Sequence, residues 1–355
     1  MDWNRYKLVG NVRAGGFGQV IELSDSYLDR TVVYKNMQNV ADNTQLKIEV
    51  AALVKARSRH IVEIYDVDLA ADGTFNGMVI ENLTGRDYSE FFKEAAADPE
   101  QTTKIIYQLA LALSDLHSVG IVHRDLKIDN FKSSSSGIVK LFDFGISSLN
   151  GPHVTALNRG TYEYAAPELY VRGAVISSCT DVYALGICCW KLISSSLPAS
   201  LSEQPPMQSG HPPSIATVAP YLDLYVARII DKCLLSEERD RPTAREVANC
   251  CEAALLRGKH NGAFTRSKTN VKIYELSAGA TSVKINIPNL GELRAAYSGY
   301  GFYVQGTHGD VFMNNYPIPP NTALLDACVI TFGSFDKGAD REYVSFHCSK
   351  PEVVL

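Results

Sequence analysis

HRDLKIDN at residues 123–130 and LFDFG at residues 141–145 are the most informative motifs of the chain. Asp125 and Asn130 lie in the first stretch, and Asp143 lies in the second. Two carboxylates and a carboxamide at these separations suit Mg²⁺, a hard cation that keeps several waters and takes few protein ligands besides phosphate oxygens. The two stretches therefore predict a site for a phosphate compound together with its magnesium.

Two features upstream fit the same chemistry, although each is weak alone. Lys35 ends the strand-like run VVYK, and Glu49 follows fourteen residues later on a segment with helical apolar spacing. The two charges could meet across the fold, although most such charges are simply solvated. The run RAGGFGQV at residues 13–20 separates two predicted strands. Its backbone amides could close over phosphates, or its glycines could serve an ordinary hairpin turn.

The pattern of apolar residues changes twice along the chain. From residue 5 to about residue 81, short β-branched runs alternate with turns and predict a mostly antiparallel sheet interrupted by one helix. Helical spacing then dominates, with clear periods over residues 102–117, 179–193 and 221–235. The middle of the chain is therefore expected to be mainly helical.

Three further motifs complete an ordered set. They are AAPE at residues 165–168, TDVYALG at 180–186 and RDRPTAREV at 239–247. With these landmarks, residues 5–256 resemble a eukaryotic-type protein kinase domain. The resemblance implies an α+β, bilobal kinase fold, with an N-lobe over residues 1–81 and a C-lobe over residues 82–256. It also implies ATP and Mg²⁺ as cofactors and a protein substrate.

The resemblance assigns catalytic roles position by position. Asp125 would accept the proton of the attacking hydroxyl group, and Asn130 with Asp143 would hold the magnesium ions. Lys127 would steady the γ-phosphate during transfer. A lysine two residues after Asp125 resembles the serine/threonine branch of the family, so Ser or Thr acceptors are expected.

The same resemblance places the nucleotide. Lys35 would bind the α and β phosphates, and Glu49 would fix it. Val20 would pack on the adenine, and the hinge from Glu81 to Leu83 would pair with the base, leaving Ile80 at the gatekeeper position. The backbone amides that would cover the phosphates are those of Gly15, Gly16 and Gly18.

One position departs from the family pattern, because Arg13 replaces the first glycine of the phosphate loop. Weaker ATP binding is one consequence to expect, since a side chain costs backbone freedom at a turn. The alternative function is a nucleotide-binding, pseudokinase-like scaffold. Such a protein would more often lose Lys35, Asp125 or Asp143, and all three are present here.

Residues between the motifs carry further predictions. Thr155 is a candidate activating phosphorylation site, because a phosphate there could pair with Arg124 and order its loop. An unmodified loop threonine is the plain alternative. Structural roles are expected for Glu168 with Arg241 as an ion pair, for Asp181 as a clamp on the catalytic loop, and for Phe144 in the core.

The last third of the chain has a different pattern. Residues 257–270 are polar and basic and predict an interdomain linker. Residues 271–355 return to a period of two and predict an all-β sandwich. Within it, residues 301–333 resemble the later half of forkhead-associated domains, which implies an FHA-like domain that binds protein partners.

Four phosphothreonine-binding positions of that family are altered. Ala280 follows Gly279 where an arginine would stand, Gly291 and Arg294 replace a serine and a histidine, and Gly309 replaces an asparagine. The leading interpretation is an interaction module without standard phosphothreonine binding. A remodelled phosphate reader that uses Arg294 and His308, or a domain that only packs on the kinase, is the alternative.

Composition excludes several other classes of protein. The 34 basic and 39 acidic residues leave a net charge of −5, so no global positive field draws in nucleic acid or membrane lipid. The N-terminus lacks a signal-peptide pattern, and the longest strongly apolar stretch, residues 182–193, is too short to span a bilayer. Eight cysteines without a C-x-x-C motif suit small core residues in a reducing compartment, so a cytoplasmic location is expected.

Overall fold

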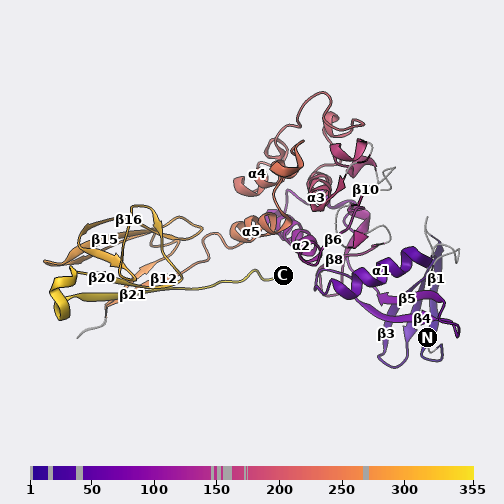
Figure 1. The fold of residues 1–355 in the computed structure, drawn as a ribbon, viewed down its shortest axis with the longest axis horizontal. Coiled ribbons are helices and arrows are strands. Elements are labelled where there is room, and N and C mark those ends of the chain that lie inside the picture. Colours follow the sequence, from indigo (N-terminus) through magenta and orange to yellow (C-terminus); the bar gives the residue numbers. More distant parts are fainter. Residues whose placement is uncertain are drawn as a thin grey trace. The chain divides into compact units, whose positions relative to one another are not determined.

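The chain divides into two compact units, Met1–Cys251 and Glu252–Val354 (Figure 1). The structure is a computed structural model that describes residues 3–14, 19–36, 43–144, 148–149, 153–154, 162–171, 173, 175–266 and 272–355. The boundary between the units falls inside the helix α5 (Ala244–Leu255). Each unit has a hydrophobic core of its own.

The first unit begins with an antiparallel five-stranded sheet in the order β1-β2-β3-β5-β4. Its strands are β1 (Tyr6–Ala14), β2 (Gln19–Asp25), β3 (Arg30–Asn36), β4 (Ile64–Leu69) and β5 (Phe75–Glu81). The helix α1 (Asn43–Lys55) crosses between β3 and β4 and buries Leu46 and Leu53. This arrangement confirms the predicted sheet with one inserted helix.

The remainder of this unit is mainly helical. Its long helices are α2 (Pro99–Ser118), α3 (Ser178–Ile193), α4 (Leu224–Cys233) and α5. Asp98 caps α2 by accepting a hydrogen bond from the Gln101 backbone N–H at 2.9 Å, and Pro99 opens the first turn. Both faces of α3 are buried, which explains its nearly unbroken apolar sequence. Figure 1 shows α2 and α3 side by side in this lobe.

Short elements connect these helices. The strands β7 (Phe131–Ser133) and β8 (Val139–Leu141) form a hairpin with the serine-rich turn at its tip. Two more pairs join β6 (Ile121–Val122) to β9 (Ser148–Leu149) and β10 (His153–Val154) to β11 (Val175–Ile176). Among the described residues of the unit, the 3₁₀ helices are Phe91–Lys93, Ile128–Asn130, Tyr162–Tyr164, Pro167–Tyr170, Ala199–Leu201, Ile215–Thr217 and Glu238–Asp240.

The second unit is built from two antiparallel sheets. The six-stranded sheet has the order β13-β12-β21-β20-β17-β18, and the four-stranded sheet has the order β14-β15-β16-β19. Between them lies one apolar core that includes Phe264, Phe332 and Phe346. The strands are β12 (Gly262–Arg266), β13 (Lys272–Leu276), β14 (Ser282–Ile287), β15 (Gly291–Tyr297), β16 (Phe302–Gly309), β17 (Val311–Met313), β18 (Tyr316–Pro317), β19 (Thr322–Ala323), β20 (Ala327–Phe332) and β21 (Glu342–Cys348), and a 3₁₀ segment spans Phe335–Asp340.

The predicted linker over residues 257–270 is wrong in its middle part, because Gly262–Arg266 form β12. This strand pairs with both β13 and β21 and places Phe264 in the core. The prediction failed because Phe264 is the one large apolar residue of the strand. Gly262 did not indicate a strand either. A glycine is needed there because a Cβ would lie 2.9 Å from ring atoms of Phe302 and Phe346.

Candidate active site

Three charged side chains from distant parts of the chain meet between the sheet and the helical lobe. Lys35 lies on β3, Glu49 lies on α1, and Asp143 follows β8. The Lys35 ammonium donates to the two Glu49 oxygens at 2.8 and 2.9 Å and to Asp143 Oδ1 at 2.9 Å. The predicted contact of Lys35 with Glu49 is therefore confirmed, and Asp143 completes the cluster.

Burial shapes the electrostatics of this cluster. The side chains of Lys35 and Glu49 are 14% and 3% exposed, whereas that of Asp143 is 39% exposed. Burial alone would lower the pKa of Lys35, but the two carboxylates outweigh it and raise its pKa, so the ammonium keeps its charge. Burial opposes ionisation of Asp143, yet Lys35 holds the pKa of this carboxyl below its ordinary value. For Glu49, burial raises the pKa.

The loop that holds Asp125 lies between β6 and the 3₁₀ turn Ile128–Asn130. Lys127 Nζ donates to Asp125 Oδ2 at 3.0 Å. The Asn130 amide nitrogen donates to the Asp125 backbone oxygen at 2.7 Å and to Asp125 Oδ2 at 3.3 Å. Neither bond uses the amide oxygen of Asn130, which is the atom that can ligate a hard cation.

Asp181 fixes this loop from α3. Its buried carboxylate accepts hydrogen bonds from the backbone N–H groups of His123 and Arg124, both at 2.8 Å, and from His117 Nε2 at 2.9 Å. Burial by itself would raise the pKa of Asp181, but these bonds, above all the one from His117, hold it below the ordinary value. The clamp predicted for Asp181 is confirmed.

Two residues of the site have left-handed backbone. Arg124 has φ of 72° and Asp143 has φ of 65°, a region that residues with a side chain seldom adopt. The hydrogen bond from the Arg124 N–H to Asp181 holds the first residue in this conformation. Lys35 holds the side chain of the second. Such local strain persists only where surrounding contacts fix it, and it clusters at functional sites.

Phe144 links the two halves of the site. Its ring is fully buried and meets the His123 ring edge-on, with centroids 4.9 Å apart. Its backbone N–H donates to Glu49 Oε1 at 3.3 Å. The predicted core position of Phe144 is confirmed, and the ring packs against His123 of the catalytic loop.

The predicted hinge follows β5. Ile80 is nearly buried at the end of this strand, and Val20 on β2 lies directly opposite Lys35 on β3. Directly opposite residues of an antiparallel pair point to the same face, so Val20 and Lys35 face the same side of the sheet. Leu83 is half-buried and follows Glu81 in the connection to the helical lobe.

Sequence reasoning missed a buried ion pair at the hinge. Lys140 on β8 donates to Glu81 Oε2 at 2.6 Å, and the side chains are 8% and 15% exposed. Glu81 Oε2 also accepts from the Glu63 backbone N–H at 3.3 Å. Because Lys140 precedes Asp143 by three residues, the pair joins β8, the strand that leads to Asp143, to the predicted hinge. A lysine between the apolar neighbours Val139 and Leu141 was the available signal.

A second predicted ion pair stabilises the helical lobe. Arg241 donates to the two Glu168 oxygens, both at 2.7 Å, in a bidentate arrangement. The guanidinium group is fully buried and also binds the backbone oxygens of Leu235, Ser236 and Cys179. The predicted pair is confirmed.

Some predicted site residues lie outside the described residues. These are Gly15, Gly16 and Gly18 of the glycine run, and Thr155. Within the described part of the chain, no group of three or more His, Cys, Asp or Glu side chains could hold a metal ion. A magnesium site would therefore depend on Asn130 and Asp143 with waters and phosphate oxygens, as this cation prefers.

A family profile for the protein kinase domain matches residues 5–250, which is most of the chain. The chain belongs to the protein kinase family. The matched segment contains every element of the site described above. The predicted family of the first unit is therefore confirmed, whereas the forkhead-associated likeness of the second unit stays a prediction.

The chain is similar to serine/threonine-protein kinases of several bacteria. The chain is 27% identical over 271 residues to the serine/threonine-protein kinase pkn3 of Myxococcus xanthus, a match that covers 68% of this chain and 48% of the relative. It is 28% identical over 291 residues to the probable serine/threonine-protein kinase PknB of Lactococcus lactis, covering 76% and 46%. The chain thus spans about half the length of these relatives. Among the described helices, none is both long and apolar enough to cross a membrane.

The Lys140–Glu81 pair yields a stability prediction. The substitution Lys140→Met leaves a buried carboxylate without its cation and is expected to cost about 3 kcal/mol of the free energy of unfolding. Lys132, which lies opposite Lys140 in the same hairpin, is the matched control, and Lys132→Met is expected to cost less than about 1 kcal/mol. Denaturant unfolding measures both values, and equal losses would contradict the role given to the pair.

Proposed function

We propose that this chain is a serine/threonine protein kinase that transfers the γ-phosphate of ATP to hydroxyl groups of proteins. The observation that carries the proposal is the contact of Lys35 with both Glu49 and Asp143, beside a loop in which Lys127 and Asn130 surround Asp125. This arrangement gathers cations for phosphates, ligands for a hard cation and a carboxylate base at one place. Phosphoryl transfer needs little else, because it depends on positioning and charge neutralisation.

Each residue has a chemical task under this proposal. Asp125 accepts the proton of the incoming hydroxyl, and its hydrogen bonds from Lys127 and Asn130 orient the carboxylate. Because Lys127 lies beside this carboxylate, its ammonium group can also bind the γ-phosphate next to the acceptor hydroxyl. Lys35 binds the α and β phosphates, which compete with Asp143 for one of its three N–H donors.

The cofactors fit the residues that the structure describes. Asn130 and Asp143 would hold Mg²⁺, which supplies charge neutralisation at the phosphates when bound. Asp143 stays ionised because Lys35 lowers its pKa, and the amide oxygen of Asn130 is not used by the loop. Val20 and the Glu81–Leu83 hinge would bind the adenine. The fixed hinge strand supports this role, since Lys140 immobilises Glu81.

Ser and Thr are the proposed acceptor residues because of Lys127 and because the relatives are named serine/threonine kinases. A cytoplasmic location, a protein substrate and the absence of nucleic-acid and membrane partners belong to the same proposal. The nucleotide-binding scaffold is the second candidate function. Arg13 in the glycine run is the observation that favours it.

The substitution Asp125→Asn tests the proposal. Without the base, we expect transfer to a mixture of Ser- and Thr-containing peptides to fall by about 10²–10⁴-fold. ATP affinity should change by less than about threefold, since Asp125 does not bind the nucleotide base or Lys35. Radiolabel transfer and a fluorescent ATP analogue measure the two quantities.

The control is Asp129→Asn, which removes an exposed carboxylate four residues from Asp125. This variant should keep wild-type transfer. A wild-type chain that binds ATP and Mg²⁺ but transfers no phosphate would support the scaffold instead.

Regulation by phosphorylation of Thr155 is a further part of the proposal. The backbone of Arg124 is fixed by Asp181 next to Asp125, so a phosphothreonine that paired with the Arg124 side chain would be held near the site. Intact-mass analysis and peptide mapping after incubation with ATP and Mg²⁺ should find one phosphate on Thr155, and Thr155→Ala should lower the rate. Phosphate on other residues but never on Thr155 would reject this part.

The second unit is inferred to be an FHA-like interaction module without standard phosphothreonine binding. Arg294, which could donate hydrogen bonds to a phosphate group, lies on β15. Its guanidinium group forms an ion pair with Glu292 at 2.8 Å. Gly291 and Gly309 lie opposite each other in the sheet, where a Cβ on Gly309 would come within 3.1 Å of the Gly291 Cα. Close backbone packing, rather than a lost ligand, therefore explains these glycines. Titrating the full chain with matched phosphothreonine and threonine peptides distinguishes this inference from a remodelled phosphate reader.

A further inference from the structure

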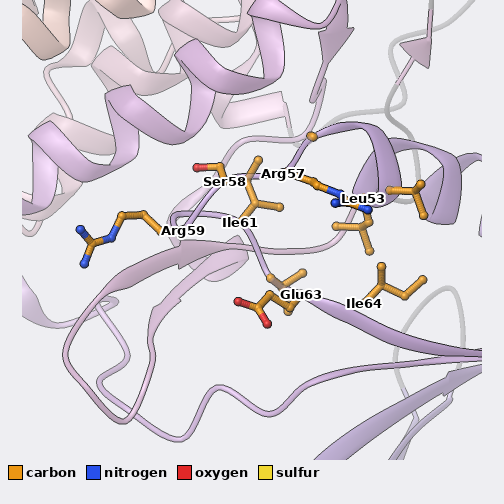
Figure 2. Close-up of a pocket in the computed structure, with 10 residues that line it drawn as sticks. Leu53, Arg57, Ser58, Arg59, Ile61, Glu63 and Ile64 are labelled. Carbon is orange, nitrogen blue, oxygen red and sulfur yellow. The ribbon is translucent and has the colours of Figure 1, made fainter.

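A pocket of about 640 Å³ lies at the end of α1, outside the site described above. Its walls are the last turn of α1, the connection over residues 56–63 and the start of β4 (Figure 2). Pockets of this size accommodate small molecules or a few peptide side chains. The kinase chemistry proposed above uses none of its lining residues.

The floor of the pocket is apolar. Leu53, Ala56, Ile61 and Val62 line it, and each of these residues is at most 4% exposed. Val54 adds an exposed apolar wall, since 54% of this residue is open to solvent. An exposed valine beside a buried apolar floor favours a ligand that brings its own apolar group.

The rim of the pocket is basic. Arg57 and Arg59 line it, both are exposed, and neither has a hydrogen bond or an ion pair with another described residue. In Figure 2, Arg59 extends away from the other labelled side chains, and Glu63 and Ile64 lie on the side that leads into β4. Glu63 is the acidic residue of the lining, and Lys140 offsets it at 3.5 Å. The rim therefore attracts negative charge, although the whole chain carries a net charge of −5.

We propose that this pocket binds an acidic peptide segment of another protein, one that presents an apolar side chain between carboxylates. The apolar side chain would contact the floor and Val54, and the carboxylates would pair with Arg57 and Arg59. Guanidinium groups suit this task because they bind carboxylates in bidentate geometry. A small inorganic anion would leave the apolar floor uncovered, and the negative net charge opposes nucleic acid.

The walls of the pocket connect directly to the active site. Leu53 follows Glu49 by four residues on α1, so the two lie one above the other on the same face of the helix. On the other wall, the Val62 N–H donates to the Leu141 oxygen and the Leu141 N–H donates to the His60 oxygen, both at 2.9 Å. Leu141 precedes Asp143 by two residues. A bound segment would therefore restrain the helix that holds Glu49 and the strand that leads to Asp143.

Binding is tested on the full chain with labelled five-residue peptides and fluorescence anisotropy. The probe has a central leucine and Asp or Glu at the other four positions. The comparison peptides replace the leucine by glycine or the acidic residues by lysine. We expect the probe to bind with a Kd below about 1 mM, and each comparison peptide to bind at least about fivefold more weakly.

The double variant Arg57→Glu with Arg59→Glu should weaken binding of the probe by at least about tenfold, because it reverses the charge of the rim. The matched control is Arg228→Glu with Arg239→Glu, two exposed arginines elsewhere in the unit, which should change the Kd by less than about twofold. Arg57→Lys with Arg59→Lys keeps the charge and should retain binding within about threefold. This conservative variant guards against loss of folding in the charge reversal.

Several results would overturn the proposal. They are a probe Kd above about 1 mM, or equal affinity for the probe and for the lysine or glycine peptide. An unchanged probe Kd in the charge-reversed variant, or full displacement of the probe by equimolar inorganic phosphate, would have the same meaning. A dimer that the charge reversal dissociates in sedimentation velocity would also overturn it, because the occupant would then be a second copy of the chain.

The effect on catalysis rests on the proposed function and has a separate readout. Saturating probe should change the ATP affinity of the wild-type chain at least about twofold, and it should leave the charge-reversed variant unaffected. Binding without transfer activity would reject the proposed kinase function alone. Binding without any change in ATP affinity would reject the coupling to the active site.

Discussion

A buried ammonium group needs partners, and the cluster around Lys35 depends on this constraint. Removing Lys35 from water is costly unless opposite charges replace the solvent. Here Glu49 and Asp143 supply them at 2.8–2.9 Å, from segments 14 and 108 residues away. The sheet, α1 and the segment after β8 must therefore be positioned together before this charge is satisfied. The geometry that would bind phosphates is thus tied to the packing of the lobe.

The catalytic loop obeys a second constraint, because its backbone adopts a conformation that would not persist alone. Arg124 is held with positive φ by the buried carboxylate of Asp181, which binds two consecutive N–H groups. His117 keeps this carboxylate ionised. Helix α3 therefore acts as a rigid support for the position of Asp125. Phe144 extends the support to the neighbouring Asp143 through its contact with His123 and its hydrogen bond to Glu49.

Ordered motifs made much of this site predictable. Lys35 with Glu49, Glu168 with Arg241, and Asp181 with the catalytic loop were each expected and are each observed. The helix over residues 102–117 was predicted from its period, and its true start at Pro99 follows from the cap at Asp98.

Other features could not be predicted from the sequence, because they depend on tertiary contacts. β12 was mistaken for linker, since only Phe264 contributes a large apolar side chain and one of its two partner strands, β21, lies about 80 residues further along the chain. Lys140 looked like one more strand lysine, because nothing local shows that Glu81 lies opposite it. The pocket at the end of α1 likewise appears only when the helix and β4 are placed in space.

A double-mutant cycle between Lys35→Met and Glu49→Gln, read as the rate of phosphate transfer at limiting ATP, tests whether Lys35 and Glu49 act together. If the two side chains act as one unit that binds phosphate, the double variant should be barely slower than either single variant. The interaction energy would then exceed about 1 kcal/mol, as found for groups in direct contact. Strictly additive losses, with an interaction energy near zero, would contradict the account.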